Sequence, residues 1–209
     1  MIRFDRYGKP KGTRLFSAVL LAAVWLFALH PPASAQQAGP GKVPLVSFAE
    51  ITGTPGASLM VPFYFTPDPQ KPLRSIAVDL EFVSNNLKFQ KASRGAASEQ
   101  AGVEIATDVT EAKPDDKGIT RSTLHVEAAL TEANSKQGLP DGLLAYLLFQ
   151  ISLDAKPFAI KLTPKVTAAE DLATPPKKVD VAQVGAEPGL VVVQVLDVMP
   201  EATCSFFTH

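Results

Sequence analysis

Two acidic residues, Asp79 and Glu81, lie two positions apart in a segment where apolar and polar residues alternate. Alternation with a period of two places such a pair on one side of a β-strand. Two carboxylates that face one cleft are the machinery of glycoside hydrolysis. Solvated acids on a strand face explain the same pattern, and we favour this interpretation because Asp and Glu are mostly exposed in proteins.

Other residues that carry chemistry are sparse. The sequence has no C-x-x-C, no H-E-x-x-H, no Asp-rich calcium loop, no G-x-S-x-G and no glycine-rich phosphate loop. Asp115 and Asp116 fit either a weak cation site or a tight turn, and the turn is the favoured interpretation. We therefore expect a protein that is not an enzyme and has no catalytic residue, no metal site and no cofactor.

The single cysteine, Cys204, lies close to the C-terminus, so no disulfide can form within the chain. In an exported protein an unpaired cysteine indicates an intermolecular disulfide with a partner. A frayed chain end with an incidental thiol is the alternative, which we favour. Without a disulfide, burial of apolar side chains must stabilise the fold, which a domain of about 150 residues allows.

The first 35 residues have the three parts of a secretory signal peptide. Residues 1–14 carry five cations and one anion, and they precede an apolar run from Leu15 to Leu29 and the sequence Ala33-Ser34-Ala35. A membrane-spanning helix takes about 20 residues, so this run is short for a span, and an uncleaved anchor is the alternative. We expect cleavage after Ala35 and export to the periplasm or the medium, with no membrane span afterwards.

The expected organisation is a signal peptide (1–35), a linker (36–43), one β-sandwich domain (44–197) and a C-terminal tail (198–209). The whole chain has 20 Lys and Arg residues against 21 Asp and Glu, and without residues 1–14 its net charge is about −5. Phosphate binding needs clustered cations. Because the sequence shows no such cluster in the body of the protein, we expect no basic patch and no nucleic-acid partner.

Three segments alternate with a period of two, which predicts strands with one buried face. The side chains expected to point inward are Leu59, Val61, Phe63 and Phe65 in the first segment, Ile76, Val78, Leu80 and Phe82 in the second, and Leu124, Val126, Ala128 and Leu130 in the third. Two further runs, 143–153 and 190–196, are apolar on both faces and fit covered or central strands, with a helix as the alternative for the first. Turn residues separate these runs, so we predict nine or ten short strands, no helix of any length, and an antiparallel β-sandwich.

Several segments resemble the cohesin domain, the module that docks dockerin-bearing enzymes in cellulosomes. The better landmarks are the opening Gly56-x-x-x-x-x-Pro62 and the pair Asp141-Gly142 before an apolar strand. Order and spacing are similar from about residue 44 to 196, with further matching stretches at 75–82, 86–89, 118–119 and 188–193. The resemblance implies an all-β jelly-roll sandwich of about nine strands, a fold shared with several cellulose-binding modules.

The sequence departs from the family in and around one strand. The family's Tyr-Asp-Pro turn is replaced by residues 82–86, of which only the aromatic Phe82 matches. The Asn and Asp with which the family binds its partner fall, without gaps, on Ser75 and Ala77.

A protein partner, dockerin-like or of another kind, needs a flat sheet face with polar groups around an apolar centre. With the family's strand order, such a face is formed beside Ala129 by the expected partner-binding residues Asp79, Glu81, Thr123, His125 and Glu127. Among these, only His125 titrates near neutral pH, so we expect binding to respond to acidification. A solvated face without a partner is the alternative.

Direct binding of a polysaccharide is a second binding hypothesis. Carbohydrate-binding modules of this fold use a flat row of exposed Trp or Tyr rings that stack on sugars. Beyond residue 35 the chain has no Trp and only two tyrosines, Tyr64 and Tyr146, which lie far apart in the sequence. Tyr64 faces away from Phe63 and Phe65 and is expected to be exposed, but one ring is a poor platform.

Overall fold

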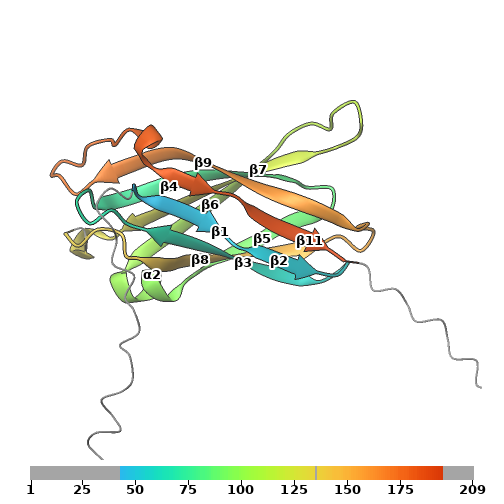
Figure 1. The fold of residues 1–209 in the computed structure, drawn as a ribbon, viewed down its shortest axis with the longest axis horizontal. Helices are drawn as coiled ribbons and strands as arrows, with labels where there is room; N and C mark the ends of the chain where they lie inside the picture. The colour runs from blue at the N-terminus through green and yellow to red at the C-terminus, as the bar shows by residue number, and fades with distance from the viewer. Residues whose placement is uncertain (1–42, 135, 195–209) are drawn as a thin grey trace, which may run out of the picture. The chain divides into compact units, whose positions relative to one another are not determined.

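Figure 1 shows two β-sheets packed face to face in the computed structural model, which describes residues 43–134 and 136–194. The first, here called the five-strand sheet, has the order β10-β1-β3-β8-β5. Its strands are β1 (Leu45–Phe48), β3 (Ser58–Thr66), β5 (Leu87–Arg94), β8 (Gly142–Ile151) and β10 (Gly185–Glu187). The second, the six-strand sheet, has the order β2-β11-β9-β4-β7-β6. Its strands are β2 (Glu50–Gly53), β4 (Leu73–Val83), β6 (Val103–Glu111), β7 (Arg121–Leu130), β9 (Phe158–Asp171) and β11 (Gly189–Val193).

The predicted all-β sandwich is confirmed, and the three alternating segments become β3, β4 and β7. All twelve side chains expected to point inward are buried in the core between the sheets. Phe149 of β8 joins the two layers, because its ring makes edge-on contacts with Phe82 of β4 at 5.3 Å and with Phe89 of β5 at 5.5 Å. Such pairs add about 0.5–1.5 kcal/mol to the stabilisation from burial.

The strand count differs from the nine or ten expected because the first and last strands each divide between the sheets. The chain passes from β1 to β2 at Ala49 and from β10 to β11 at Pro188. Pro188 has no N–H to donate, and a Cβ on the following Gly189 would lie 2.7 Å from the Cβ of Phe48. The halves also pair in parallel, β1 with β10 and β2 with β11, so the sandwich is not wholly antiparallel.

The apolar run at 143–153 forms strand β8, so the helical alternative for it is wrong. β8 pairs with β3 on one side and β5 on the other, and neighbours on both edges favour an extended backbone for an apolar run. The structure does contain one short helix that the sequence did not predict, α2 (Ala96–Ala101), which ends at Gly102 with a φ of 68°. Two single turns of 3-10 helix, η2 (Glu132–Asn134) and η3 (Val181–Gln183), complete the elements of the described residues.

The longest strand, β9, was not among the predicted segments. Its inward residues Ile160, Leu162 and Val166 are buried, but Pro164 interrupts the alternation in the sequence. The strand tolerates this proline because its pairing with β11 ends at Leu162, while its pairing with β4 continues to Asp171.

The predicted signal peptide, the predicted C-terminal tail with Cys204, and most of the predicted linker lie outside the described residues. Within the part of the chain that is described, no helix has the length and hydrophobicity that crossing a membrane requires.

Candidate binding face

The five predicted partner-binding residues lie together on the outer face of the six-strand sheet. They come from the neighbouring strands β4 and β7. The register places Asp79 opposite His125, Glu81 opposite Thr123, and Ala77 opposite Glu127. All five point away from the core, because Leu80 on β4 and Leu124 and Val126 on β7 fill the inward positions between them.

A charged row crosses the middle of this face. Lys165 of β9 lies opposite Asp79, and Asp108 of β6 lies opposite His125, which gives the order Lys165, Asp79, His125, Asp108. Nδ1 of His125 is 2.7 Å from Oδ1 of Asp79, and their side chains are 43% and 36% exposed. A side-chain contact so open to water is worth at most about 1 kcal/mol. The contact therefore orients the imidazole more than it stabilises the fold.

Small residues form the adjoining row. Ala168 of β9, Ala77 of β4 and Ala106 of β6 share it with Glu127 of β7. Ala77 is nearly buried, so the surface is low at this point. Ser75, the other position to which the cohesin resemblance assigns partner contacts, lies in the next row, and its Oγ donates a hydrogen bond to Oε2 of Glu170 at 3.4 Å. The face thus combines a small apolar centre with polar surroundings.

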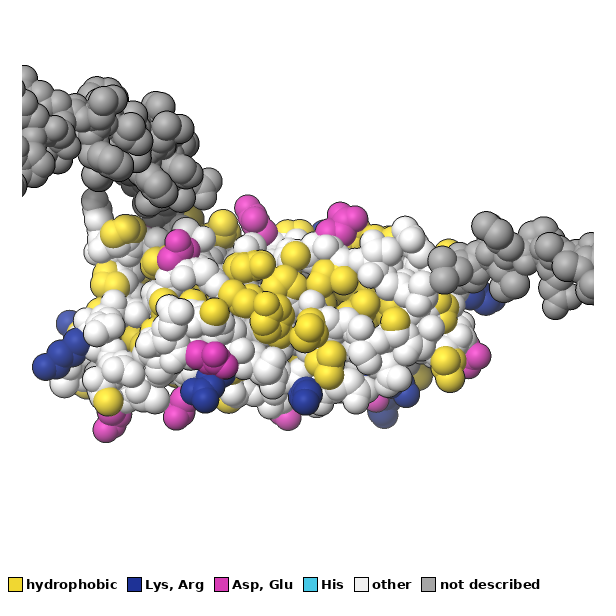
Figure 2. Space-filling model, turned by 90° about the horizontal axis from the view of Figure 1, so that it is seen from below, with side chains coloured by type: hydrophobic (Ala, Val, Ile, Leu, Met, Phe, Trp, Pro, Cys, Tyr) yellow, Lys and Arg dark blue, Asp and Glu magenta, His cyan; other side chains and the backbone are white. Residues whose placement is uncertain are grey.

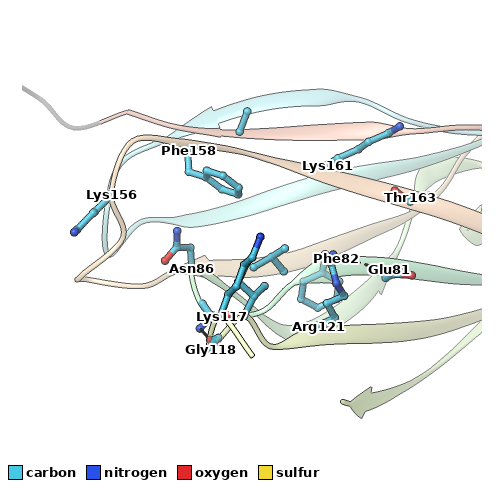
Figure 3. A pocket seen from close by; sticks show the side chains of 14 residues that line it. Glu81, Phe82, Asn86, Lys117, Gly118, Arg121, Lys156, Phe158, Lys161 and Thr163 are labelled. Carbon is cyan, nitrogen blue, oxygen red and sulfur yellow. Dashed lines mark hydrogen bonds and ion pairs between the residues drawn. The ribbon is translucent and has the colours of Figure 1, made fainter. Parts of the chain in front are cut away.

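A cleft of about 820 Å³ opens at one end of this face, where Glu81 and Thr163 belong to both. Figure 3 shows Phe158 projecting from β9 into this space and Lys117 reaching into it from the opposite side. Its cationic lining residues are Lys117, Lys156, Lys161 and Arg121. The expectation of no basic patch is therefore wrong, because residues from the β6–β7 loop, β7, the β8–β9 loop and β9 meet only in the folded chain.

The outer face of the five-strand sheet is different in character. Hydrophobic side chains gather along the middle of the molecule when it is seen from below (Figure 2). Met60 and Tyr64 of β3 are 58% and 40% exposed, which confirms that Tyr64 is accessible. Tyr146 of β8 lies opposite Pro62, so the two tyrosines are on adjacent strands although they are distant in the sequence.

Elsewhere among the described residues, Asp171 has a shifted pKa and Asp115 closes a turn. The pKa of Asp171, at the end of β9, is lowered because its carboxylate accepts hydrogen bonds from the backbone N–H groups of Lys177 and Ala173. Asp115 is a turn residue, as the favoured interpretation had it, with Oδ1 accepting from the N–H groups of Lys117 and Ile119 at 2.9 Å. Among the described residues, no three His, Cys, Asp or Glu side chains are grouped to hold a metal ion.

No protein-family model matches the chain, and no curated relative matches it either. Solved structures do. A cohesin from Clostridium thermocellum, solved in a type I complex with a dockerin, superposes with a TM-score of 0.57 at 15% identity, over 73% of this chain and 100% of its own. The fold is that of a cohesin.

Two other cohesin structures agree. The seventh type I cohesin of scaffoldin B from Pseudobacteroides cellulosolvens gives a TM-score of 0.53 at 14% identity, over 76% of this chain and 96% of its own. The third cohesin of scaffoldin C from Acetivibrio cellulolyticus, in complex with a dockerin, gives 0.54 at 17% identity, over 72% and 98%. The predicted resemblance to cohesins is thus confirmed at the level of the fold.

Sequence reasoning grouped the five polar residues on one sheet face, as the structure has them, and missed the cleft beside that face. Lys156, Lys161 and Lys165 are spaced by four or five residues in the sequence, and this was the one signal available for a local positive charge. It becomes informative only when β9 is recognised as a strand, because alternation then separates the outward lysines from the inward Ile160 and Leu162.

Proposed function

We propose that this chain is exported and acts as a non-catalytic module that binds another protein through the outer face of the six-strand sheet. The observation that carries the proposal is the grouping of five polar side chains from β4 and β7 around the low surface at Ala77. Cohesins of the same fold have been solved in complex with dockerins, which supports a dockerin-type domain as the partner class.

The chemistry of the face suits a protein partner. A stable interface buries about 800 Å² on each side, with an apolar centre inside a polar rim. The alanines around Glu127 supply such a centre, and the row from Lys165 to Asp108 supplies groups of both signs along its border. Charges arranged in this way govern orientation and association rate more than raw affinity.

The partner differs in detail from those of the family. At Ser75 and Ala77 this chain lacks the Asn and Asp through which the resemblance implies dockerin contacts. Asp79, His125 and Glu127 surround the same place with other groups. We therefore expect a dockerin-type partner whose contact residues are matched to these side chains.

The proposal is tested by placing two arginines on the face, Thr123→Arg with Glu127→Arg. We avoid His125→Asp, because it would align three carboxylates in one row with Asp79 and Asp108. The control places arginines at Met60 and Tyr64 on the other sheet, where the side chains are also exposed. Proteins retained from the exported fraction, and a panel of purified dockerins, are measured against both variants after thermal melts confirm folding.

Loss of a partner with the Thr123 and Glu127 variant, and its retention by the Met60 and Tyr64 variant, is the expected result. Retention of every partner by both variants would count against the proposed face. Export is tested separately: protein recovered from the periplasm or medium should begin after Ala35, and an intact N-terminus there contradicts the signal-peptide assignment. Non-reducing electrophoresis of the same material shows whether Cys204 forms an intermolecular disulfide.

Polysaccharide binding is the second candidate, and one observation favours it. Tyr64 and Tyr146 lie on adjacent strands beside Met60, so the five-strand sheet offers two aromatic rings on one face. Aromatic rings on a flat face are what sugar stacking requires. Retention on insoluble cellulose, chitin or xylan that is lost with Tyr64→Ala would establish this activity in place of, or beside, protein binding.

A further inference from the structure

The cleft at the end of the six-strand sheet is lined by four cations and one acid. Lys117, Lys156 and Lys161 line it, and none of the three is joined by an ion pair to any described residue. The fourth cation, Arg121, lies 3.6 Å from Glu81, the one acid of the lining. In a body whose net charge is about −5, this is a local reversal of sign.

An apolar surface lies between the lysines. Phe158 is 49% exposed and projects into the cleft (Figure 3), and the half-buried Val83 and Ile119 also line it. A half-exposed aromatic ring in the wall of a concave site is the kind of anchor that an apolar side chain of a ligand covers. The cleft, at about 820 Å³, has the volume of an ordinary ligand site.

The β6–β7 loop that carries Lys117 is tied in place. Its turn is closed by Asp115, as described above, and Asn85 holds it from the opposite side. Nδ2 of Asn85 donates to the carbonyl of Gly118 at 3.0 Å, and its Oδ1 accepts from the N–H of Thr120 at 2.6 Å. A loop ordered before binding loses little further entropy when a ligand binds.

We propose that this cleft binds a short acidic peptide segment, with carboxylates on either side of one apolar side chain. The carboxylates would lie beside the three lysines, and the apolar side chain would pack on Phe158. The proposal rests on the proposed function, because the segment belongs to the partner docked on the six-strand face. Continuity supports this source, since Glu81 and Thr163 line the cleft and also lie on that face. Complementary charge at this site would speed association and select among partners.

The test uses two fluorescein-labelled peptides of about ten residues, one with six glutamates around a central Phe and one with glutamines in their place. Fluorescence anisotropy at low salt measures their binding to the full chain. We expect the glutamate peptide to bind at least about tenfold more tightly than the glutamine peptide, and binding to weaken as salt screens the charges.

Charge reversal then locates the site. The double variant Lys117→Glu with Lys161→Glu is expected to bind the glutamate peptide at least about tenfold more weakly than the unchanged chain does. The matched control, Lys88→Glu with Lys91→Glu, makes the same change in charge at exposed lysines of β5 in the other sheet and should leave binding unchanged. Thermal melts of both variants confirm folding.

Equal binding by the cleft and control variants would overturn the proposal, and so would failure of the glutamate peptide to bind at low salt. Preferential binding of polygalacturonate would assign the cleft to an acidic polysaccharide and overturn it as well. The Thr123 and Glu127 variant separates the two proposals, because it should lose the partner and keep the peptide. Peptide binding by a chain that captures no partner overturns the proposed function and leaves the acidic preference of the cleft standing.

Discussion

The two outer faces of the sandwich cover the same core, but one exposes mainly polar and charged side chains to water and the other exposes hydrophobic ones. On the six-strand sheet, one row of charged and polar side chains crosses β9, β4, β7 and β6, with His125 between Asp79 and Asp108. On the five-strand sheet, hydrophobic side chains gather along the middle of the face (Figure 2), and Met60 and Tyr64 of β3 are exposed there.

The difference separates two roles of a strand residue. Inward positions are constrained by packing, since a core at crystal-like density accepts few changes. Outward positions are free of this constraint, so their side chains can be chosen for binding a partner. The two faces differ at these positions, with polar side chains on one and hydrophobic side chains on the other. Variants that change one face and spare the other can therefore show which surface serves stability and which serves binding.

The largest effect should come from breaking the core that both faces share. Phe149→Ala removes the ring that contacts Phe82 in one sheet and Phe89 in the other. We expect the free energy of unfolding to fall by about 3–5 kcal/mol, because a cavity replaces the ring. Urea denaturation followed by circular dichroism measures it. A loss below about 1 kcal/mol would mean that the layers are held together elsewhere.

A smaller loss is expected from the apolar face. Tyr64→Ala deletes a ring that is 40% exposed and so buries more than half of its surface. This should lower the free energy of unfolding by about 1–2 kcal/mol. Met60→Ala, at a side chain 58% exposed, is the matched comparison and should cost less. If Tyr64→Ala is neutral in the same denaturation experiment, the apolar face contributes nothing to stability and its role is recognition.

A substitution on the polar face of the six-strand sheet should lower the free energy of unfolding by less than Tyr64→Ala does. Asp79→Ala removes the contact with Nδ1 of His125, which lies open to water, so we expect a loss of about 0.2–1 kcal/mol. Partner affinity, measured by titration calorimetry, should fall much further than stability does. A stability loss equal to that of Tyr64→Ala would remove the contrast between the two faces.

The smallest effect on stability is expected at Asp171, the last residue of β9. Because its pKa is lowered in the folded protein, its charge stabilises the fold fully above its ordinary pKa of 3.8, and this contribution is lost as the pH falls through the lower folded value. Asp171→Asn keeps an acceptor for the N–H groups of Lys177 and Ala173 but has no charge. Melting temperatures of the two proteins should therefore converge below pH 3.8, and a constant difference at every pH would contradict this.

Much of the fold follows from local patterns, and much of the site does not. Alternation alone placed Phe63, Leu80 and Val126 in the core, and it forced Asp79 and Glu81 onto one face. It could not show that Asp79 meets His125, because the contact joins residues 46 positions apart and depends on register. Long-range pairing is set by the packing of the whole sandwich.

The misses have the same physical origin. Pro164 concealed β9, and with it the outward position of Lys161 in the cleft. Tyr64 and Tyr146 gave no sign in the sequence that their strands are adjacent. The first and last strands divide at Ala49 and Pro188 because their halves pair in different sheets. Local propensity does not show this division, so the predicted number of strands was too low.

The parallel pairing of the first and last strands has a mechanical consequence. The chain enters at Leu45, beside Gly185, and leaves at Val193, beside Gly53, at the other end of the same strand pairs. Tension applied through the two ends would therefore act along the strands, and the hydrogen bonds of both pairs would be loaded together in shear instead of being opened one at a time. The resistance of such a module to pulling is set by the rate of crossing the unfolding barrier and not by its equilibrium stability, because forced unfolding is governed by that rate.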